Sequence, residues 1–166
     1  ITHRESPTFG GYVFSGVGKY EKMTGRAFGE LDPSDRRNAV IVDLQHAPRN
    51  RSGRVEYSFD FYILKPIDLS RGAHKIMFEP PNRGNKLYGD FNRGAAGNDP
   101  GAVTDPRELA DAFLLQRGYS LVWSGWDATA TEMTITLPLA RNTDGSSITG
   151  PAYEYIVTGD ASMAEP

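Results

Sequence analysis

The 166-residue sequence contains no cysteine, which excludes disulfide bonds, thiolate nucleophiles and cysteine-based zinc sites. It also has no apolar run that approaches the ~20 residues needed to cross a bilayer, so no membrane span is expected. Acidic and basic residues nearly balance, with 21 Asp and Glu against 18 Lys and Arg. The net charge of -3 gives no electrostatic reason to expect nucleic acid or an anionic membrane as a partner.

Several motifs of known chemistry are missing as well. No serine stands in a G-x-S-x-G nucleophile elbow, and the three histidines lack a metal-ligand spacing such as H-E-x-x-H. We therefore expect no catalytic residue, no metal site and no cofactor in this chain. The sequence begins Ile1-Thr2-His3, without an initiator Met or a signal-peptide hydrophobic segment, which suggests a trimmed or processed chain.

The stretch Asp105–Trp126 carries the clearest structural signal, that of one helix followed by one buried strand. Asp105 suits the N-cap position, and the spacing of apolar residues predicts a helix over Pro106–Arg117. Its apolar stripe consists of Leu109, Ala112 and Phe113. Gly118 can end the helix in the left-handed conformation. Tyr119–Trp123 is then a short apolar run, which is typical of a strand covered on both faces.

A second strand is predicted upstream of this unit. His74–Glu79 has an apolar centre and stops at Pro80-Pro81, because proline cannot continue a central strand. The polar glycine turn Asn82–Asn85 follows, and a long loop then leads to the helix. The order strand, turn, loop, helix, strand predicts two parallel strands joined by a right-handed crossover. Both strands are expected to be buried on both faces.

The carboxyl ends of these two strands form the predicted site, because ligands of open α/β sheets bind beyond those ends. The oxyanion-loop candidates are Asn82, Arg83, Gly84 and Asn85. Backbone N–H groups in such a glycine turn can stabilise a developing oxyanion. A purely structural turn, with Arg83 paired to a carboxylate, is an equal alternative. The pocket candidates are Ser124, Trp126 and Asp127; no helix signal follows Ser124, as a nucleophile elbow would require.

The remaining segments predict mostly antiparallel strands. Three of them, expected to form a meander, are Glu21–Leu31, Ala39–Leu44 and Val55–Leu64. In the last of these, the residues expected to face the core are Val55, Tyr57, Phe59, Phe61 and Ile63. Glu132–Leu139 and Ala152–Thr158 predict a second β-hairpin. The chain thus divides into an antiparallel lead-in (1–72), a strand-helix-strand layer (73–127) and a β-hairpin with a tail (128–166).

Five segments together resemble the N-terminal part of a family of bacterial α/β-hydrolase-domain proteins that are regarded as esterases. They are YEKMTGRAFGELDP, NAVIVDLQHAPRN, VEYSFDFYILKP, PNRGNK and LLQRGYSLVWSGW. The resemblance covers nearly the whole chain. It implies that the first four strands of the hydrolase sheet are Ala39–Leu44, Val55–Leu64, His74–Glu79 and Tyr119–Trp123. It also places PNRGN at the oxyanion-loop position and makes Pro106–Arg117 the first helix.

The family is larger than this chain, and its nucleophile, acid and histidine come later in the sequence. The resemblance thus implies one incomplete domain, the N-terminal portion of an α/β-hydrolase mixed sheet with antiparallel lead-in strands. The expected function is to supply the oxyanion loop and part of the pocket of a serine-type carboxylic ester hydrolase. The expected partners are the remainder of that hydrolase and a small ester substrate. Because many family members carry export signals, the location favoured is periplasmic or secreted. The alternative is a non-catalytic α+β binding or structural domain.

Overall fold

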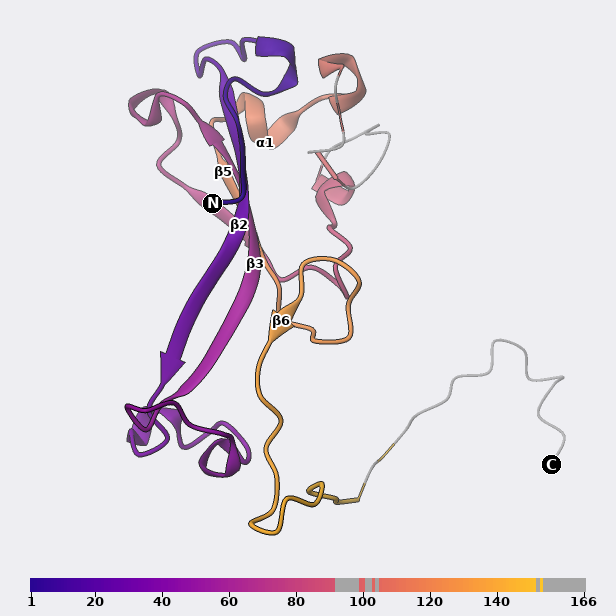
Figure 1. Ribbon diagram of the computed structural model, residues 1–166. Coiled ribbons are helices and arrows are strands. Elements are labelled where there is room, and N and C mark those ends of the chain that lie inside the picture. The colour runs from indigo at the N-terminus through magenta and orange to yellow at the C-terminus, as the bar shows by residue number, and fades with distance from the viewer. Residues whose placement is uncertain (92–98, 101–102, 104, 152, 154–166) are drawn as a thin grey trace, which may run out of the picture.

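The computed structural model describes residues 1–91, 99–100, 103, 105–151 and 153. Their strands form one mixed six-stranded sheet. The strands are β1 (His3–Glu5), β2 (Tyr20–Leu31), β3 (Val55–Pro66), β4 (Ile76–Glu79), β5 (Ser120–Ser124) and β6 (Ile135–Thr136). Their order across the sheet is β1-β2-β3-β5-β4, and β6 also pairs with β3. In Figure 1, β2 and β3 form a long twisted ribbon that extends below the other strands.

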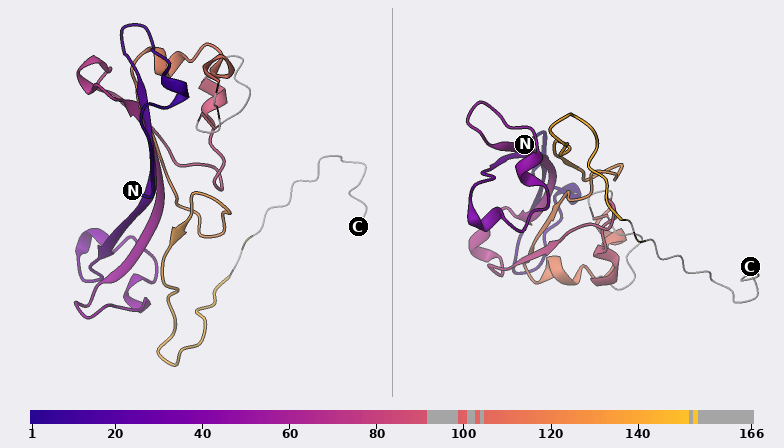
Figure 2. Two further views of the ribbon diagram at one scale, coloured as in Figure 1. Left: turned by 45° about the horizontal axis from the view of Figure 1, so that its top comes forward. Right: turned by 90° about the horizontal axis from the view of Figure 1, so that it is seen from below.

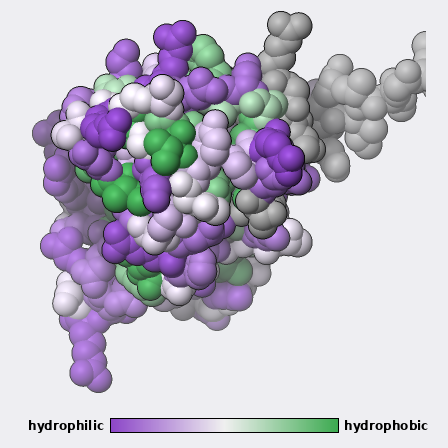
Figure 3. All heavy atoms as spheres, turned by 90° about the horizontal axis from the view of Figure 1, so that it is seen from above, coloured by the Kyte–Doolittle hydropathy of each residue, from purple (hydrophilic) through white to green (hydrophobic). Residues whose placement is uncertain are grey.

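Helical structure is sparse in the described residues, and α1 (Phe113–Gln116) is a single turn beside β5. The 3-10 turns are Phe9–Gly11, Arg36–Asn38, Leu44–His46, Leu69–Arg71, Tyr88–Phe91 and Pro106–Leu109. None of the described helices has the length and apolarity needed to cross a bilayer. Seen from the end where α1 lies, the surface is largely hydrophilic, with apolar side chains in small separate groups (Figure 3).

The predicted strand Ala39–Leu44 is wrong, because β2 and β3 pair directly with each other and leave no place for a strand between them. β2 pairs with β3 along its whole length, and β5 and β6 occupy the other edge. Residues 39–43 lie instead between two 3-10 turns, the second of which begins at Leu44, and Val40 and Val42 are more than four-fifths exposed. In place of the expected three-stranded meander, β2 and β3 form a two-stranded hairpin. The segment that connects them, residues 32–54, lies at the far end of the ribbon (Figure 2).

The predicted parallel strand pair is confirmed: β4 and β5 are parallel neighbours, with Glu79 opposite Trp123. β5 is antiparallel to β3, which places Tyr62 opposite Trp123 and Leu64 opposite Leu121. These four hydrophobic residues face one way and are at most 5% exposed. They anchor the core, which also contains residues of α1 and of the segment before β2.

The prediction that both strands are buried on both faces is wrong. Ile76 and Phe78 of β4 are 68% and 57% exposed, and Val122 of β5 is only partly buried. These three residues share the face opposite Leu121 and Trp123, because side chains alternate along a strand. Within the described residues, the sheet is therefore deeply buried on one face only.

The core-facing residues of β3 are also the reverse of the prediction between Tyr57 and Leu64. Tyr62 faces the core, whereas the ring of Phe61 lies on the other face, opposite Gly25 of β2. A Cβ on Gly25 would stand 2.7 Å from that ring. Tyr57 covers a second glycine of β2 in the same way. Aromatic rings laid over strand glycines cover backbone that has no side chain of its own, which explains the reversal.

The predicted helix Pro106–Arg117 is broken in its middle. Ala110 and Ala112 have φ angles of 54° and 45°, which an α-helix does not allow. The carboxylate of Asp111, between them, accepts a hydrogen bond from the N–H of Phe113 and so starts α1 separately. The periodicity of the apolar residues did not reveal this second start.

The two ends of that segment are confirmed. Asp105 accepts a hydrogen bond from the Arg107 N–H, and Gly118 has a positive φ of 75°. The end of α1 is tied to the sheet by the buried Tyr20 hydroxyl, whose single proton is shared between the carbonyls of Leu115 and Tyr119, 2.9 and 3.0 Å away.

Part of the predicted hairpin after residue 128 is different in the structure. Glu132–Leu139 contributes only the two-residue strand β6, which pairs with β3. Apart from Tyr153, the second expected strand, Ala152–Thr158, lies outside the described residues. After β6 the chain runs downward beside the ribbon (Figure 1).

Candidate functional site

The segments that follow β4 and β5 lie side by side at the carboxyl ends of these strands. The indole Nε1–H of Trp126 donates a 2.6 Å hydrogen bond to the carbonyl of Pro81. Gly84 lies against the loop before β6, because a Cβ on it would be 2.5 Å from the carbonyl oxygen of Glu132. The structure thus brings the oxyanion-loop candidates and the pocket candidate Trp126 together.

The turn Asn82–Asn85 is closed by its own backbone. The N–H of Asn82 donates to the carbonyl of Asn85 at 2.8 Å, and the reverse bond is 2.9 Å long. Arg83 and Gly84 have φ angles of 49° and 90°, as in a type I′ turn. Within the part of the chain that the structure describes, the N–H groups of Arg83 and Gly84 have no hydrogen-bond acceptor. Two of the four residues can therefore offer backbone donors.

Asp127 lies next to this turn and is ionised at neutral pH. Hydrogen bonds from the hydroxyl and the N–H of Thr129, both 2.7 Å long, lower the pKa of its carboxyl, and the positive charge of Arg83 adds to the effect. Arg83 and Asp127 are thus complementary charges across the two segments. Trp126 is 53% exposed, so part of this residue is open to solvent.

Ser124 is less favourably placed than the other pocket candidates. It ends β5 opposite Phe61 and lies on the face away from the core, because it alternates with Trp123. The next residue, Gly125, donates its N–H to the carbonyl of Asp60 at 2.8 Å, and turns follow rather than a helix. Ser124 therefore does not stand in a strand-to-helix elbow.

Two buried charged residues flank the turn, and neither was identified from the sequence as part of the site. Glu79 is only 8% exposed, and its carboxylate accepts 2.6 Å hydrogen bonds from the Trp123 indole and the Leu87 N–H. It therefore ties β4, β5 and the chain after the turn together. Its position at the end of an alternating strand, in register with Met77, could have indicated an inward-facing carboxylate.

Lys86 directly follows the turn and is 7% exposed. Its Nζ lies 3.1 Å from a carboxylate oxygen of Asp99 and 5.0 Å from the centre of the Tyr62 ring. The same Nζ atom lies 6.0 Å from the centre of the Trp123 ring. Burial of this ammonium depends on contacts with distant strands, so no local pattern could have indicated it.

No protein-family model, curated protein or solved structure matches this chain. The resemblance to hydrolases stays a prediction.

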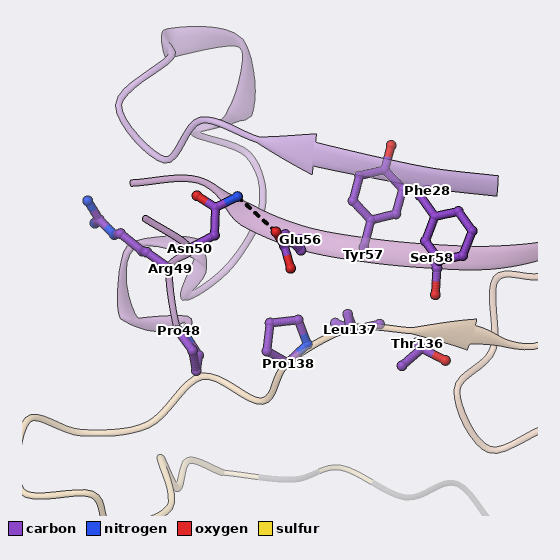
Figure 4. A pocket seen from close by; sticks show the side chains of 10 residues that line it. All are labelled: Phe28, Pro48, Arg49, Asn50, Glu56, Tyr57, Ser58, Thr136, Leu137 and Pro138. Atoms are coloured by element: carbon purple, nitrogen blue, oxygen red, sulfur yellow. Dashed lines mark hydrogen bonds between the residues drawn. The ribbon is translucent and has the colours of Figure 1, made fainter. Parts of the chain in front are cut away.

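Other parts of the described surface show fewer features of a catalytic or binding site. A cavity of about 540 Å³ lies between the β2–β3 ribbon and residues 136–138 (Figure 4), and its lining includes none of the predicted site residues. Among its lining residues, Asn50 donates a hydrogen bond to Glu56. Among the described residues, no group of three or more His, Asp or Glu side chains could hold a metal ion. No serine–histidine hydrogen bond is present in that part of the chain either.

Proposed function

We propose that this chain is the N-terminal segment of a serine-type α/β-hydrolase that acts on carboxylic esters, and that it supplies the oxyanion loop and part of the substrate pocket. The observation that carries the proposal is the type I′ turn at the carboxyl end of β4. Its two central N–H groups have no acceptor among the described residues, and Trp126 lies beside it. Such donors stabilise the negative charge that develops on an ester oxygen during acyl transfer.

The exposed side of the sheet supports the same proposal. β4 is at the edge of the described sheet, and its apolar residues Ile76 and Phe78 are largely in water. Parallel strands are normally covered on both faces. Further strands and helices of a larger hydrolase would cover these side chains.

In the proposed reaction, a serine from the remainder of the enzyme attacks the ester carbonyl. The carbonyl oxygen, as it becomes negatively charged, accepts hydrogen bonds from the N–H groups of Arg83 and Gly84. Each oxyanion donor of this kind contributes ~10²–10³ in turnover. The exposed part of Trp126 would form one wall for the ester. The acid and histidine of the triad also come from the remainder, and a periplasmic or secreted location rests on the family resemblance.

A non-catalytic α+β binding or structural domain is the second candidate. The observation that favours it is the direction of the strands in the sheet. Among the named, described strands, β4 and β5 are the one parallel pair, and the other pairs are antiparallel. A single α-helical turn accompanies this sheet in the described residues. An α/β-hydrolase would need more parallel strands and helices from elsewhere.

Labelling of the complete natural protein with a fluorophosphonate probe separates the two candidates. The hydrolase proposal expects one labelled serine per molecule, located outside residues 1–166, together with hydrolysis of a small ester such as p-nitrophenyl acetate. Absence of labelling and of esterase activity would favour the non-catalytic domain. Stoichiometric labelling of Ser124 would contradict both the proposal and the placement of that residue outside an elbow.

A further inference from the structure

The segment that connects β2 to β3, residues 32–54, exposes consecutive apolar side chains at the far end of the ribbon (Figure 1). Val40 and Val42 are 86% and 84% exposed, and Ile41 between them is 39% exposed. Single exposed apolar residues are common on protein surfaces, but a run of three is unfavourable in water and normally marks a contact surface. We call Val40, Ile41 and Val42 the apolar tip.

The apolar tip is held in place by the residues on either side of it. The N–H of Ile41 donates to the carbonyl of Asn38 at 3.0 Å, and the side-chain amide of Asn38 donates to the carbonyl of Asp32 at 2.9 Å. On the other side of the tip, Leu44 is 7% exposed and anchors the segment. Because the turn is already fixed, little chain entropy is lost when the tip enters a binding surface.

The apolar surface continues beside the tip. Leu139, in the chain after β6, is 71% exposed and lines a cavity together with Ile41 and Val42. This cavity has a volume of about 340 Å³, and most of its lining residues are apolar. Exposed aliphatic side chains from two segments and an apolar cavity therefore lie together at this end of the molecule.

The same segment is basic, although the chain as a whole is acidic. Residues 32–54 contain five arginines and three aspartates, which gives a charge of +2, whereas the whole chain carries -3. Two of the arginines are paired, Arg37 with Asp35 and Arg54 with Asp32. The other three arginines of the segment, all exposed, are Arg36, Arg49 and Arg51. Among the described residues, none of these three lies within salt-bridge distance of a carboxylate. The net charge of the chain therefore conceals a positive charge around the apolar tip.

We propose that residues 32–54 dock on an anionic lipid bilayer, with the apolar tip among the acyl chains and the arginines against the headgroups. An anionic bilayer is the partner that uses both properties, because it presents negative headgroups directly above an apolar layer. Val40 follows Arg36 by four positions, so their Cα atoms are at most about 14 Å apart. The guanidinium can therefore stay at headgroup level while the valine enters the apolar layer.

Docking of this kind requires no membrane-spanning helix. It is also independent of the proposed hydrolase function, because none of the predicted site residues belongs to residues 32–54.

The test measures binding of the complete natural protein to lipid vesicles of two compositions by co-sedimentation. One set consists of phosphatidylcholine alone, and in the other set about a quarter of the lipid is phosphatidylglycerol. At about 0.1 M NaCl, we expect binding to the anionic vesicles to be at least about tenfold tighter. This difference should largely disappear at about 0.5 M NaCl, because salt screens the arginines. Absence of binding to the anionic vesicles, or equal binding to both sets, would overturn the proposal.

Val40→Ser combined with Val42→Ser tests whether the apolar tip enters the lipid. Both side chains are exposed, so the fold should be preserved, and binding to the anionic vesicles should weaken at least about tenfold. The matched control combines Ile67→Ser with Leu69→Ser, two partly exposed residues beyond the other end of β3, and should leave binding unchanged. Full binding by the variant of Val40 and Val42 would show attraction by charge alone and would overturn insertion of the tip.

Arg36→Gln combined with Arg51→Gln tests the contribution of the positive charge. Binding to the anionic vesicles should weaken about tenfold or more, whereas the weaker binding to phosphatidylcholine should stay the same. Undiminished binding by this variant would also overturn the proposal. If another part of the complete protein or a protein partner covers the apolar tip instead, the unchanged protein will not bind the anionic vesicles, which counts against the proposal in the same way.

Discussion

Replacing Glu79 by glutamine should loosen the chain around the predicted oxyanion turn. The Glu79 carboxylate accepts hydrogen bonds from the Trp123 indole and from the Leu87 N–H, and it is 8% exposed. Glutamine has nearly the same shape but only one acceptor oxygen, so one of the two donors loses its partner. The amide NH₂ of glutamine would then face that donor.

The expected loss can be worked out from these two contacts. A hydrogen bond to a charged group contributes about 1.5–3 kcal/mol, and a buried donor without a partner costs a similar amount. We therefore expect Glu79→Gln to lower the free energy of unfolding by about 2–3 kcal/mol, measured by urea denaturation of the protein as purified. The indole N–H signal of Trp123 should also shift, because its acceptor has changed.

Glu108→Gln is the matched control, because Glu108 is an exposed glutamate in a 3-10 turn. It should change stability by no more than about 0.5 kcal/mol. If Glu79→Gln has as small an effect as this control, the carboxylate does not hold the strands and the turn together.

Three further predictions follow from other contacts. Tyr20→Phe should lower the free energy of unfolding by about 1–3 kcal/mol, because its hydroxyl serves two backbone carbonyls at the end of α1; an unchanged urea midpoint would contradict this. Gly125→Ala should cost at least about 2 kcal/mol, since its Cβ would overlap two carbonyl oxygens of the loop before β6, and normal stability would contradict that close approach. Burial alone would raise the pKa of Glu21, but hydrogen bonds from Lys65 and Arg4 lower it below the ordinary 4.5. Glu21 therefore stabilises the fold fully above pH 4.5, and this contribution is lost as the pH falls through the lowered pKa. Acid unfolding of Glu21→Gln should accordingly depend less steeply on pH below 4.5, and an identical pH profile would argue against the ion pairs.

The features that could be predicted from the sequence have strong local signals. β4 is predicted from an apolar run that ends at Pro80-Pro81. β5 is predicted from a second apolar run, which begins after Gly118, the glycine that follows α1. The turn Asn82–Asn85 is predicted from its glycine and its polar residues. Its positive φ angles fall on Gly84 and on Arg83, which has no sequence preference for them. These signals act within a few residues, and they were enough to locate both halves of the candidate site.

The features that could not be predicted depend on distant partners. The segment Ala39–Leu44 has a strand-like composition, but β2 and β3 pair directly with each other and leave no place for it between them. The rings of Phe61 and Tyr57 lie over glycines of β2, which reverses the expected face, and this follows only from the register of the hairpin. Lys86 is buried in contact with Asp99 and the Tyr62 ring, which are distant in the sequence. Its burial therefore cannot be inferred from the residues next to it in the chain.

Gly84→Ala in the complete natural protein tests most directly whether the turn supplies the oxyanion donors. Gly84 has φ 90° and lies against Glu132, so a methyl group must displace the turn and its two N–H groups. Gly53→Ala is the control, because Gly53 has a similar φ of 76° in open space and therefore carries the backbone strain alone. We expect ester turnover to fall ~10²–10³-fold for Gly84→Ala and to stay unchanged for Gly53→Ala. The melting temperature should fall more for Gly84→Ala, because its Cβ meets the backbone carbonyl of Glu132 in addition to the backbone strain that both variants share. Unchanged turnover in a folded Gly84→Ala variant would contradict the proposed role of this turn.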